Sequence, residues 1–252
     1  MKNIVDLTGK TILVTGASDG IGRQTSKTIS EVGGKVILVG RSEEKLNAVL
    51  SELTGDGHAI YSYDLKNVEG IDGFIKDLVK THGALDGLVH CAGESQVRPL
   101  KMCNPEFMKS IFEINYFAFI ELVRAYSMKK NNNGGSIVVM SSVGSRSGDK
   151  GKLAYTSSKA AVDGAVRTLA KELAEKNIRV NSVVAGMIKT GIYDRYVEKN
   201  GEEAMQRVIL SRQYLGVGQT DDVANAITYL LSDAAKFITG TGIAVDGGYL
   251  SC

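Results

Sequence analysis

The sequence predicts an α/β protein built on a doubly wound parallel sheet. Short apolar runs alternate with longer amphipathic stretches along nearly the whole chain. The apolar runs are continuous, which is typical of strands that helices cover on both faces. Strict alternation of strand and helix implies parallel strands joined by helical crossovers. The length of 252 residues suits one such domain.

These patterns place each element in order. The strands are expected at 11–15, 35–39, 58–63, 85–91, 136–142, 179–184 and 242–246, which makes a seven-stranded sheet. The helices are expected at 21–32, 43–53, 68–81, 105–127, 155–175 and 220–231. Thr220 is the expected N-cap of the last helix. The stretch 191–218 fits neither pattern, so we expect a long polar loop that serves as a substrate lid. No linker or repeat interrupts the series, and 1–252 is expected to form a single domain.

Composition excludes several classes of protein. Hydrophobic residues make up 43% of the chain and charged residues 23%, so the chain can bury a core and is not disordered. The formal net charge of +2 argues against a nucleic-acid-binding protein as a whole. No apolar segment is long enough to predict a membrane span or a signal peptide. The cysteines, Cys91, Cys103 and Cys252, have no metal-ligand spacing, so we expect no metal and free thiols in a reducing cytoplasm.

A glycine-rich turn follows the first predicted strand. It reads Thr15-Gly16-Ala17-Ser18-Asp19-Gly20-Ile21-Gly22. A strand, a glycine turn and a helix form the phosphate site of a Rossmann domain, where the free N–H groups of the helix point at the phosphates. Gly16 permits the sharp turn, Gly20 lets a pyrophosphate approach the backbone, and Gly22 lets the helix pack closely on the strand. The turn therefore predicts a dinucleotide cofactor.

The end of the second strand indicates which dinucleotide is bound. An acidic residue there would grip the ribose hydroxyls of NAD, whereas an arginine accommodates the 2′-phosphate of NADP. The sequence has Arg41-Ser42 at this place and no acid before Glu43. The guanidinium of Arg41 suits a phosphate, so NADP is favoured and NAD stays possible. Asp19 weakens this inference, because it brings a negative charge to the phosphate turn.

Tyr155 and Lys159 are four residues apart and share one face of the predicted helix. The strand before this helix ends in Ser141 and Ser142, and the carboxyl ends of parallel strands face the ligand crevice. A tyrosine with an ordinary pKa near 10 exchanges protons poorly at neutral pH. A nearby ammonium favours the phenolate and lowers that pKa. Together with the glycine turn, the pair predicts general acid/base chemistry beside the cofactor.

With these motifs the chain resembles the short-chain dehydrogenase/reductase family. The resemblance runs from Gly9 to Gly248. Besides the glycine turn it rests on Asp64-Leu65, Ala92-Gly93, Asn115, Ser142, Tyr155-x-x-x-Lys159, residues 181–190 and Val245-Asp246-Gly247-Gly248. It implies hydride transfer between a nicotinamide and a carbonyl or secondary alcohol. Within the family the chain is most similar to reductases of the 3-oxoacyl-carrier-protein type and related ketoreductases.

The resemblance also implies roles for individual residues. Tyr155 would give a proton to the carbonyl oxygen, and Ser142 would hydrogen-bond that oxygen. Lys159 would hold the nicotinamide ribose and lower the pKa of Tyr155, and Asn115 would position a water that relays protons to Lys159. The cofactor contacts implied beside Tyr155 and Lys159 are Gly16, Ser18, Asp19, Gly20, Ile21, Gly22, Arg41, Ser42, Asp64, Leu65, Ala92, Gly93, Gly186, Ile188 and Thr190.

Two departures from the family pattern stand beside these residues. His90-Cys91 replaces the usual pair of asparagines after the fourth strand. We expect His90 to substitute structurally and Cys91 to be a buried small residue. Ala185-Gly186 replaces the usual Pro-Gly before the segment that contacts the nicotinamide. The missing proline predicts a less rigid turn.

Substrate and partners are less well defined by the sequence. The loops at 94–104, 144–153 and 187–216 are expected to set specificity. They carry Arg98, Lys101, Arg146, Lys150 and Lys152, which either attract an anionic or carrier-bound substrate or form a solvated rim. Lys129, Lys130 and Lys171 are either a docking site for an acidic carrier or ordinary surface lysines. The alternatives are an NAD-dependent alcohol, sugar or hydroxysteroid dehydrogenase and a non-enzymatic cofactor-binding protein. By resemblance a homotetramer is expected, with interfaces at 105–127, 155–175 and 220–246.

Overall fold

All seven strands lie in one parallel sheet in a computed structural model of the chain. The model describes residues 4–251, apart from the side chains at 192, 199, 200, 204, 205 and 208. The strands are β1 (Thr11–Thr15), β2 (Lys35–Gly40), β3 (Ala59–Ser62), β4 (Leu85–His90), β5 (Asn132–Ser142), β6 (Ile178–Ala185) and β7 (Gly242–Val245). They are ordered β3-β2-β1-β4-β5-β6-β7, and every pairing is parallel. The predicted fold class is confirmed, and the single domain over 1–252 stays a prediction.

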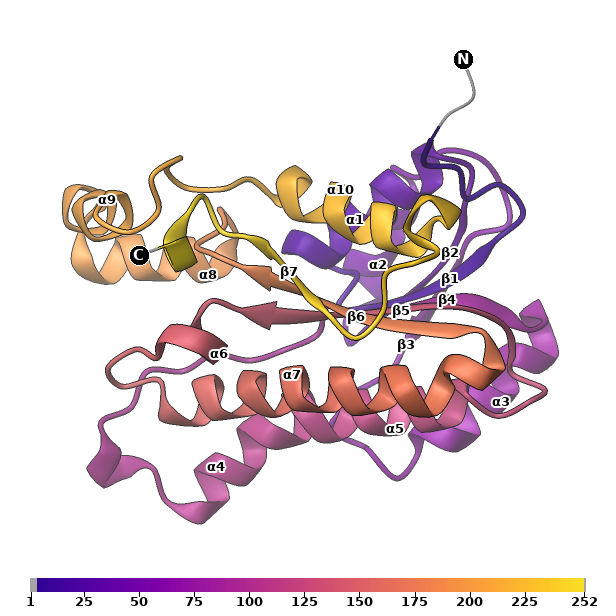
Figure 1. Cartoon of the computed structure of the whole chain (residues 1–252), viewed down its shortest axis with the longest axis horizontal. Coiled ribbons are helices and arrows are strands. Elements are labelled where there is room, and N and C mark those ends of the chain that lie inside the picture. The colour runs from indigo at the N-terminus through magenta and orange to yellow at the C-terminus, as the bar shows by residue number, and fades with distance from the viewer. Residues whose placement is uncertain (1–3, 252) are drawn as a thin grey trace.

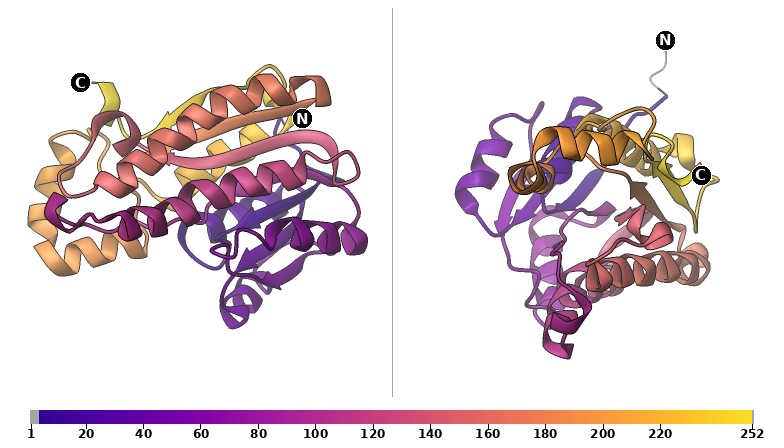
Figure 2. Two further views of the ribbon diagram at one scale, coloured as in Figure 1. Left: turned by 90° about the horizontal axis from the view of Figure 1, so that it is seen from below. Right: turned by 90° about the vertical axis from the view of Figure 1, so that its left-hand side faces the viewer.

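Helices cover both faces of the sheet (Figures 1 and 2). One face packs against α1 (Gly20–Glu31), α2 (Glu43–Leu50) and α10 (Thr220–Leu231), and the other against α3 (Ile71–His82), α5 (Ala118–Tyr126) and α7 (Leu153–Leu173). Ile29 and Leu38 are fully buried in the first layer, and Phe119 and Val162 in the second. The apolar strands therefore lie between two separate cores, as continuous hydrophobic runs require.

The order of the strands reverses between β1 and β4. From β1 the chain builds outward through β2 to β3, and then returns so that β4 pairs with β1 on its other side. In open sheets of this kind, ligands bind outside the carboxyl ends of the strands at such a switch point. Figure 1 shows α8 (Gly191–Asn200) and α9 (Glu202–Leu210) at this end of the sheet.

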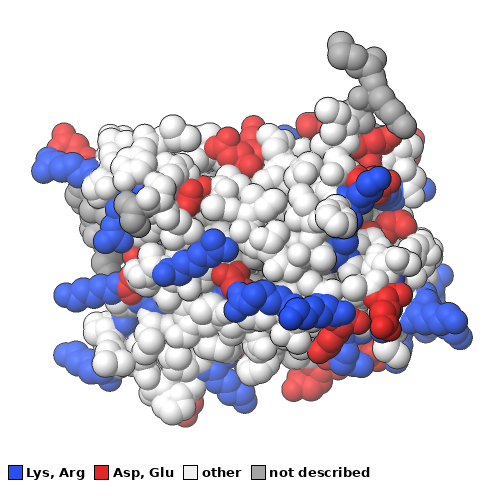
Figure 3. Space-filling model, in the orientation of Figure 1, with Lys and Arg blue, Asp and Glu red and all other residues white. Residues whose placement is uncertain are grey.

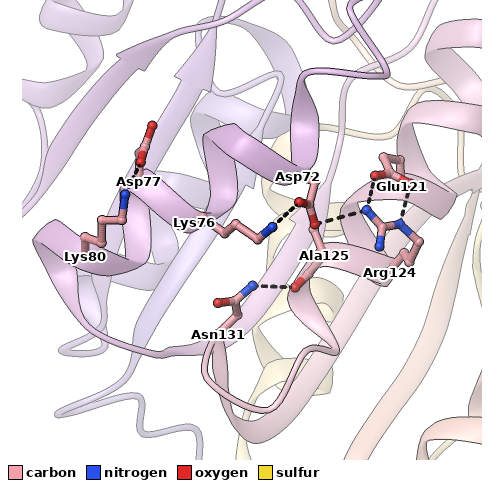
Figure 4. Close-up of polar contacts among 8 residues, drawn as sticks. All are labelled: Asp72, Lys76, Asp77, Lys80, Glu121, Arg124, Ala125 and Asn131. Atoms are coloured by element: carbon pink, nitrogen blue, oxygen red, sulfur yellow. Dashed lines mark hydrogen bonds and ion pairs between the residues drawn. The ribbon is translucent and has the colours of Figure 1, made fainter.

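Ion pairs join α3 to α5 (Figure 4). Arg124 contacts Asp72 of α3 at 3.0 Å and Glu121 of its own helix at 2.6 Å, and Lys76 also contacts Asp72. Hydrogen bonds from Lys76 and the charge of Arg124 hold the pKa of Asp72 below its usual value. Exposed ion pairs add little to the free energy of unfolding. Their consequence here is orientation, because Arg124 is held between two carboxylates.

The stretch 191–218 is not the long polar loop that the sequence predicts. It folds into α8 and α9, which meet at Gly201 with a φ of 80°. Tyr193, Tyr196 and Val197 follow helical spacing and pack with Ile209 of α9 in a small apolar cluster. The helical spacing of these apolar residues is the signal in the sequence that would have predicted α8. The N-cap of α10 also differs from the prediction, because Gln219 takes that place and forms a capping box with Asp222.

The helix predicted at 105–127 is interrupted. It consists of α4 (Pro105–Phe112), one π-helical turn (Glu113–Phe117) and α5. The fully buried His90 at the end of β4 provides a physical reason, since its Nε2 donates to the carbonyl of Ile114 at 3.2 Å. Its Nδ1 lies 2.9 Å from the Thr15 hydroxyl. Burial and the charge of Lys159 lower the pKa of His90 to about 3, so the ring is neutral and structural.

The remaining cysteine, metal and membrane predictions concern groups spread along the chain. Cys91 and Cys103 are free thiols, and Cys252 lies outside the described residues. Cys91 is half-buried and not fully buried as expected, yet desolvation raises the pKa of its thiol to about 12, which suits an inert thiol. Within 4–251 there is no group of three or more His, Cys, Asp or Glu side chains that could hold a metal ion. No helix in that part of the chain is long and apolar enough to cross a membrane.

Candidate active site

The glycine turn leaves β1 and enters α1 with very little free space. Gly16 has a φ of 67°, and a Cβ there would lie 2.7 Å from the amide nitrogen of Ala92. A Cβ on Gly22 would lie 2.2 Å from the carbonyl oxygen of Gly16. Asp19 is the N-cap of α1, and its Oδ1 accepts from the amide of Gly20 at 2.7 Å. The first turn of α1 is therefore pressed against the end of β1, with its N-terminus open to the crevice.

A cavity of about 570 Å³ lies at this N-terminus. It runs between the ends of β1, β2 and β4 and the start of α8. The predicted cofactor residues that line it are Gly16, Ser18, Asp19, Gly20, Ile21, Gly22, Arg41, Asp64, Leu65, Ala92, Gly93 and Thr190. The structure thus brings together residues that the sequence places up to 174 positions apart (Gly16 and Thr190).

The far end of this cavity holds Arg41 and a second base that the sequence analysis missed. Lys45 lies in the first turn of α2, four residues after Arg41, and lines the same cavity. A second base so close to Arg41 in the sequence was the available signal. Ser42 does not line the cavity, and instead caps α2 by accepting from the amide of Lys45 at 3.3 Å. Arg195 of α8 also lines the cavity, and no sequence pattern pointed to it.

Ser142 and Tyr155 meet at the end of β5. Ser142 is the last residue of β5, and its side chain hydrogen-bonds with Tyr155 in the first turns of α7. The hydroxyl of Ser142 also accepts from the amide of Gly144 at 3.1 Å. Ser141 is buried and its hydroxyl faces Ser145 at 3.4 Å. The contact with Tyr155 therefore distinguishes Ser142 from its neighbour, as the resemblance to the family implies.

Lys159 and Asn115 both lie close to Gly93. The nearest atoms to a Cβ built on Gly93 would be Asn115 Oδ1 at 3.0 Å and Lys159 Nζ at 3.6 Å. Asn115 sits in the π-helical turn and is fully buried, and its amide contacts the backbone of Glu94 and the hydroxyl of Ser158. Lys159 Nζ donates to the carbonyl of Met140 at 2.8 Å. The π-helical turn thus brings an amide next to the ammonium.

The pKa of Tyr155 is raised, whereas the sequence predicts that it is lowered. Burial raises it above its usual value, and the hydrogen bond from Ser142 and the charge of Lys152 lower it only in part. Lys159 Nζ lies 5.9 Å from the centre of the Tyr155 ring and is occupied by Met140. Burial lowers the pKa of Lys159 itself to about 8. The expected net lowering at Tyr155 is therefore absent, because the cost of a buried phenolate outweighs these contacts.

A second cavity, of about 730 Å³, adjoins the first at Ile21, Gly93 and Thr190. Ser142, Tyr155 and Lys159 line it, together with the predicted cofactor residues Gly186 and Ile188. All three segments predicted to set specificity contribute, and Val97, Val143, Met187 and Ile209 give it apolar walls. Tyr196 and Tyr249 line it as well, and neither was identified from the sequence.

The five loop bases do not all face this cavity. Lys150 and Lys152 line it. Arg98 instead stacks on the Phe107 ring at 4.0 Å, and Arg146 donates to the carbonyl of Gly242 at 3.3 Å. Lys101 is exposed and lines neither cavity. Of the two interpretations of these bases, attraction of a substrate is left to Lys150 and Lys152, because tertiary contacts turn the arginines away.

The turn after β6 is held by a side chain that the sequence analysis missed. Gln213 is 1% exposed, and its amide pairs with both the N–H and the carbonyl of Met187, at 2.9 and 3.0 Å. The same amide donates to the carbonyl of Gly216. A Cβ on Gly186 would lie 2.5 Å from Gln213 Oε1. The turn that lacks its proline is therefore restrained by hydrogen bonds.

Two adjoining cavities, a phosphate-type turn in the first and a Ser–Tyr–Lys cluster in the second define a dinucleotide-dependent oxidoreductase. A family model described as "Enoyl-(Acyl carrier protein) reductase" matches residues 16–250. A 3-oxoacyl-(acyl-carrier-protein) reductase from Rickettsia felis is 37% identical over 249 residues, covering 98% of this chain and 99% of that protein. A glucose 1-dehydrogenase from Gluconobacter oxydans is 34% identical, covering 95% and 91%.

A solved structure agrees with these matches. A protein designated a short-chain alcohol dehydrogenase from Sinorhizobium meliloti superposes with a TM-score of 0.93 at 32% identity, covering 99% of both chains. The chain belongs to the short-chain dehydrogenase/reductase family. It is an NAD(P)-dependent oxidoreductase that acts on CH–OH groups and the corresponding carbonyls.

Proposed function

We propose that the protein is an NADP-dependent ketoreductase of the 3-oxoacyl-carrier-protein reductase type. The observation that carries the proposal is the contact of Ser142 with Tyr155 in the second cavity, which Lys159 also lines. The apolar walls of the second cavity suit an acyl chain, and the similarity to the Rickettsia felis reductase supports the same substrate class. The substrate is then a small or carrier-bound 3-oxoacyl compound.

The residues present fit a dinucleotide. The tight packing of Gly16 and Gly22 leaves the N-terminus of α1 facing the first cavity, where Gly20 and Ile21 would hold the pyrophosphate. Asp64 and Leu65 line the end that would take the adenine, and Gly186, Ile188 and Thr190 would contact the nicotinamide. When bound, the nicotinamide supplies or accepts the hydride.

Tyr155 and Ser142 would handle the substrate oxygen. In reduction, Ser142 donates a hydrogen bond to the carbonyl and Tyr155 gives that oxygen its proton, which leaves a phenolate and an alcohol. Lys159 stabilises the phenolate, and Asn115 positions a water that returns a proton through Lys159. In oxidation the same phenolate accepts the alcohol proton. Burial of Tyr155 keeps it protonated at neutral pH, which suits the reductive direction.

The reaction is tested with a panel of ketones, acyl thioesters and keto-sugars, followed by the loss of NADPH absorbance. Turnover of 3-oxoacyl thioesters above the other carbonyls is expected. Tyr155→Phe should abolish turnover with little change in the thermal midpoint, because only the hydroxyl is removed. Unchanged turnover in Tyr155→Phe would show that another group moves the proton.

The cofactor preference is tested by fluorescence titration with NADPH and NADH. Arg41 and Lys45 lie together at the far end of the first cavity and would bind a 2′-phosphate. Arg41→Gln should weaken NADPH binding about 10-fold or more, as expected for a lost charged hydrogen bond, and leave NADH binding unchanged. Tighter binding of NADH than of NADPH by the unmodified protein would refute the preference.

An NAD-dependent alcohol, sugar or hydroxysteroid dehydrogenase is the second candidate. The carboxylate of Asp19 lines the first cavity and disfavours extra phosphate charge, and the similarity to the Gluconobacter oxydans glucose 1-dehydrogenase supports a sugar. The same two assays separate the candidates, because this one predicts NADH binding and oxidation of a polyol. A non-enzymatic cofactor-binding protein would show neither turnover.

We also propose a cytoplasmic homotetramer. Figure 3 shows few charged side chains over α10 and β7, whereas basic side chains follow α6 (Gly144–Ser147) and α7. Phe237, next to α10, is fully exposed, which supports an interface there. Leu173 of α7 is buried in the core, so it packs within the chain and does not form part of such an interface. A sizing column tests the assembly.

Lys129, Lys130 and Lys171 are exposed and would dock an acidic carrier.

A further inference from the structure

Lys152 lies between the second cavity and α8, and it has no part in the mechanism above. Lys152 immediately precedes α7, three residues before Tyr155, and its side chain is only 17% exposed. Its Nζ lies 3.2 Å from Asp149 Oδ2 and 5.1 Å from the centre of the Tyr196 ring. These three residues and Tyr155 all line the second cavity.

The contacts of Lys152 join two segments that are far apart in the chain. Lys152 and Asp149 belong to the loop that enters α7, whereas Tyr196 lies on α8 and packs into the apolar cluster of Tyr193 and Ile209. A cation within about 6 Å of an aromatic centroid is attracted to the ring. The attraction is stronger where solvent is largely excluded. Lys152 therefore links α8 to the start of α7, the helix that carries Tyr155.

The charge of Lys152 persists despite its burial. Burial alone would lower the pKa of Lys152, but the charge of Asp149 and the contact with Tyr196 raise it above its ordinary value. At Tyr155, burial raises the pKa, Ser142 lowers it and Lys152 lowers it further. Tyr196 and Asp149 act in the opposite direction. Lys152 is thus charged at neutral pH and lines the same cavity as Tyr155, whereas the pKa of Lys159 lies near 8.

We propose that Lys152 is a positioning residue that joins α8 to the entrance of α7 and keeps a positive charge beside Tyr155. The inference rests on the proposed function, in which Tyr155 exchanges the proton. The charged and titratable groups around Tyr155 are Lys159 on its own helix, Lys152 and Asp149 in the preceding loop, and Tyr196 on α8. Glu94, Lys150, Arg212 and Tyr249 lie further along the same cavity wall.

The test compares variants that change the charge in opposite directions. Lys152→Met removes the cation, Lys152→Arg retains it, and Lys152→Arg combined with Asp149→Asn removes the anion beside a cation that stays charged without a partner. In carbonyl reduction kcat/KM falls as Tyr155 loses its proton, above the step near pH 8 that belongs to Lys159, and the Tyr155 step should move up by about one pH unit in Lys152→Met. It should stay in place in Lys152→Arg and move down in the double variant. A merely structural role predicts no such opposed pair.

A titration without substrate or cofactor provides a second readout. The phenolate absorbance of each variant is measured against the same variant carrying Tyr155→Phe, which isolates the one tyrosine. Lys80→Met is the matched control, because Lys80 pairs with Asp77 at the same three-residue spacing but about 75% exposed on α3 (Figure 4). It should leave the Tyr155 titration unchanged.

The outcomes separate the two proposals. A titration that moves up in Lys152→Met and down in the double variant Lys152→Arg/Asp149→Asn, without carbonyl turnover in any protein, upholds the charge effect and refutes only the proposed reaction. Turnover with identical pH profiles and titrations in Lys152→Met and Lys152→Arg overturns the inference. If Lys152→Met does not fold, Lys152→Arg and the double variant Lys152→Arg/Asp149→Asn still decide, because identical titrations in these two proteins contradict the electrostatic link.

Discussion

Replacing His90 by asparagine should remove a measurable part of the acid sensitivity of this protein. His90 is fully buried, with Thr15 on one ring nitrogen and the Ile114 carbonyl on the other. Burial is the largest reason that its pKa falls to about 3, and the nearby charge of Lys159 adds to it. In the unfolded chain the ring would titrate at its ordinary value of 6.5. Between pH 3 and pH 6.5, therefore, His90 binds a proton in the unfolded chain but not in the folded protein.

The sign and size of the effect follow from proton linkage. Above pH 6.5 both states are neutral and His90 adds no pH dependence. Below it, the free energy of unfolding falls by about 1.4 kcal/mol for each pH unit until the folded ring titrates near pH 3. Lowering the pH from 7.5 to 5.0 therefore costs about 2 kcal/mol. For a chain of this length that corresponds to a thermal midpoint lower by about 4–8 °C.

The assay is calorimetry of the unmodified protein and of His90→Asn at pH 7.5 and 5.0. The difference between the two midpoints should be smaller in His90→Asn by about 4–8 °C, whatever the variant costs at pH 7.5. His82→Asn, at a partly exposed ring on α3, controls for the removal of a histidine. Equal pH dependence in the protein and in His90→Asn would refute the reasoning.

Three further predictions concern the site. Gly22→Ala should weaken cofactor binding at least about 10-fold and cost about 1–3 kcal/mol, because its methyl would meet the Gly16 carbonyl, whereas Gly73→Ala in open space on α3 should stabilise. Lys159→Met should abolish turnover yet raise the free energy of unfolding near pH 7 by about 1–3 kcal/mol, since the buried ammonium has its pKa lowered to about 8; a lower midpoint would contradict this. Gln213→Ala should weaken binding of the nicotinamide dinucleotide but not of ADP, measured by titration calorimetry; equal losses would contradict a local role.

The sequence was sufficient for the parts of the site that depend on local pattern. The glycine turn, Ser142 and the Tyr155–Lys159 pair each follow directly from a strand end or from helical spacing, so placing the strands also placed them. Contacts made through tertiary structure were not accessible in this way. Arg98 and Arg146 lie on the predicted loops, but a phenylalanine ring and a backbone carbonyl elsewhere in the chain determine where they point.

The π-helical turn is a second feature that the local sequence pattern could not predict. Its apolar spacing is close enough to that of an α-helix that 105–127 was predicted as one helix. The reason for the extra residue lies in β4, where His90 takes up the Ile114 carbonyl. The histidine was noticed as a departure from the family pattern, yet its partner could be found only in three dimensions. The consequence reaches Asn115, the next residue, whose amide then faces Gly93 and Lys159.

The missing proline at 185 has a specific physical consequence. A proline restrains its turn in the folded and unfolded chain alike, because it limits the backbone itself. Gln213 restrains the same turn only when the connection between α9 and α10 is in place, since that connection carries it. Displacing α9 would therefore release Met187 and the segment proposed to contact the nicotinamide. In this chain the order of that segment depends on the position of α9, a coupling that a proline would not create.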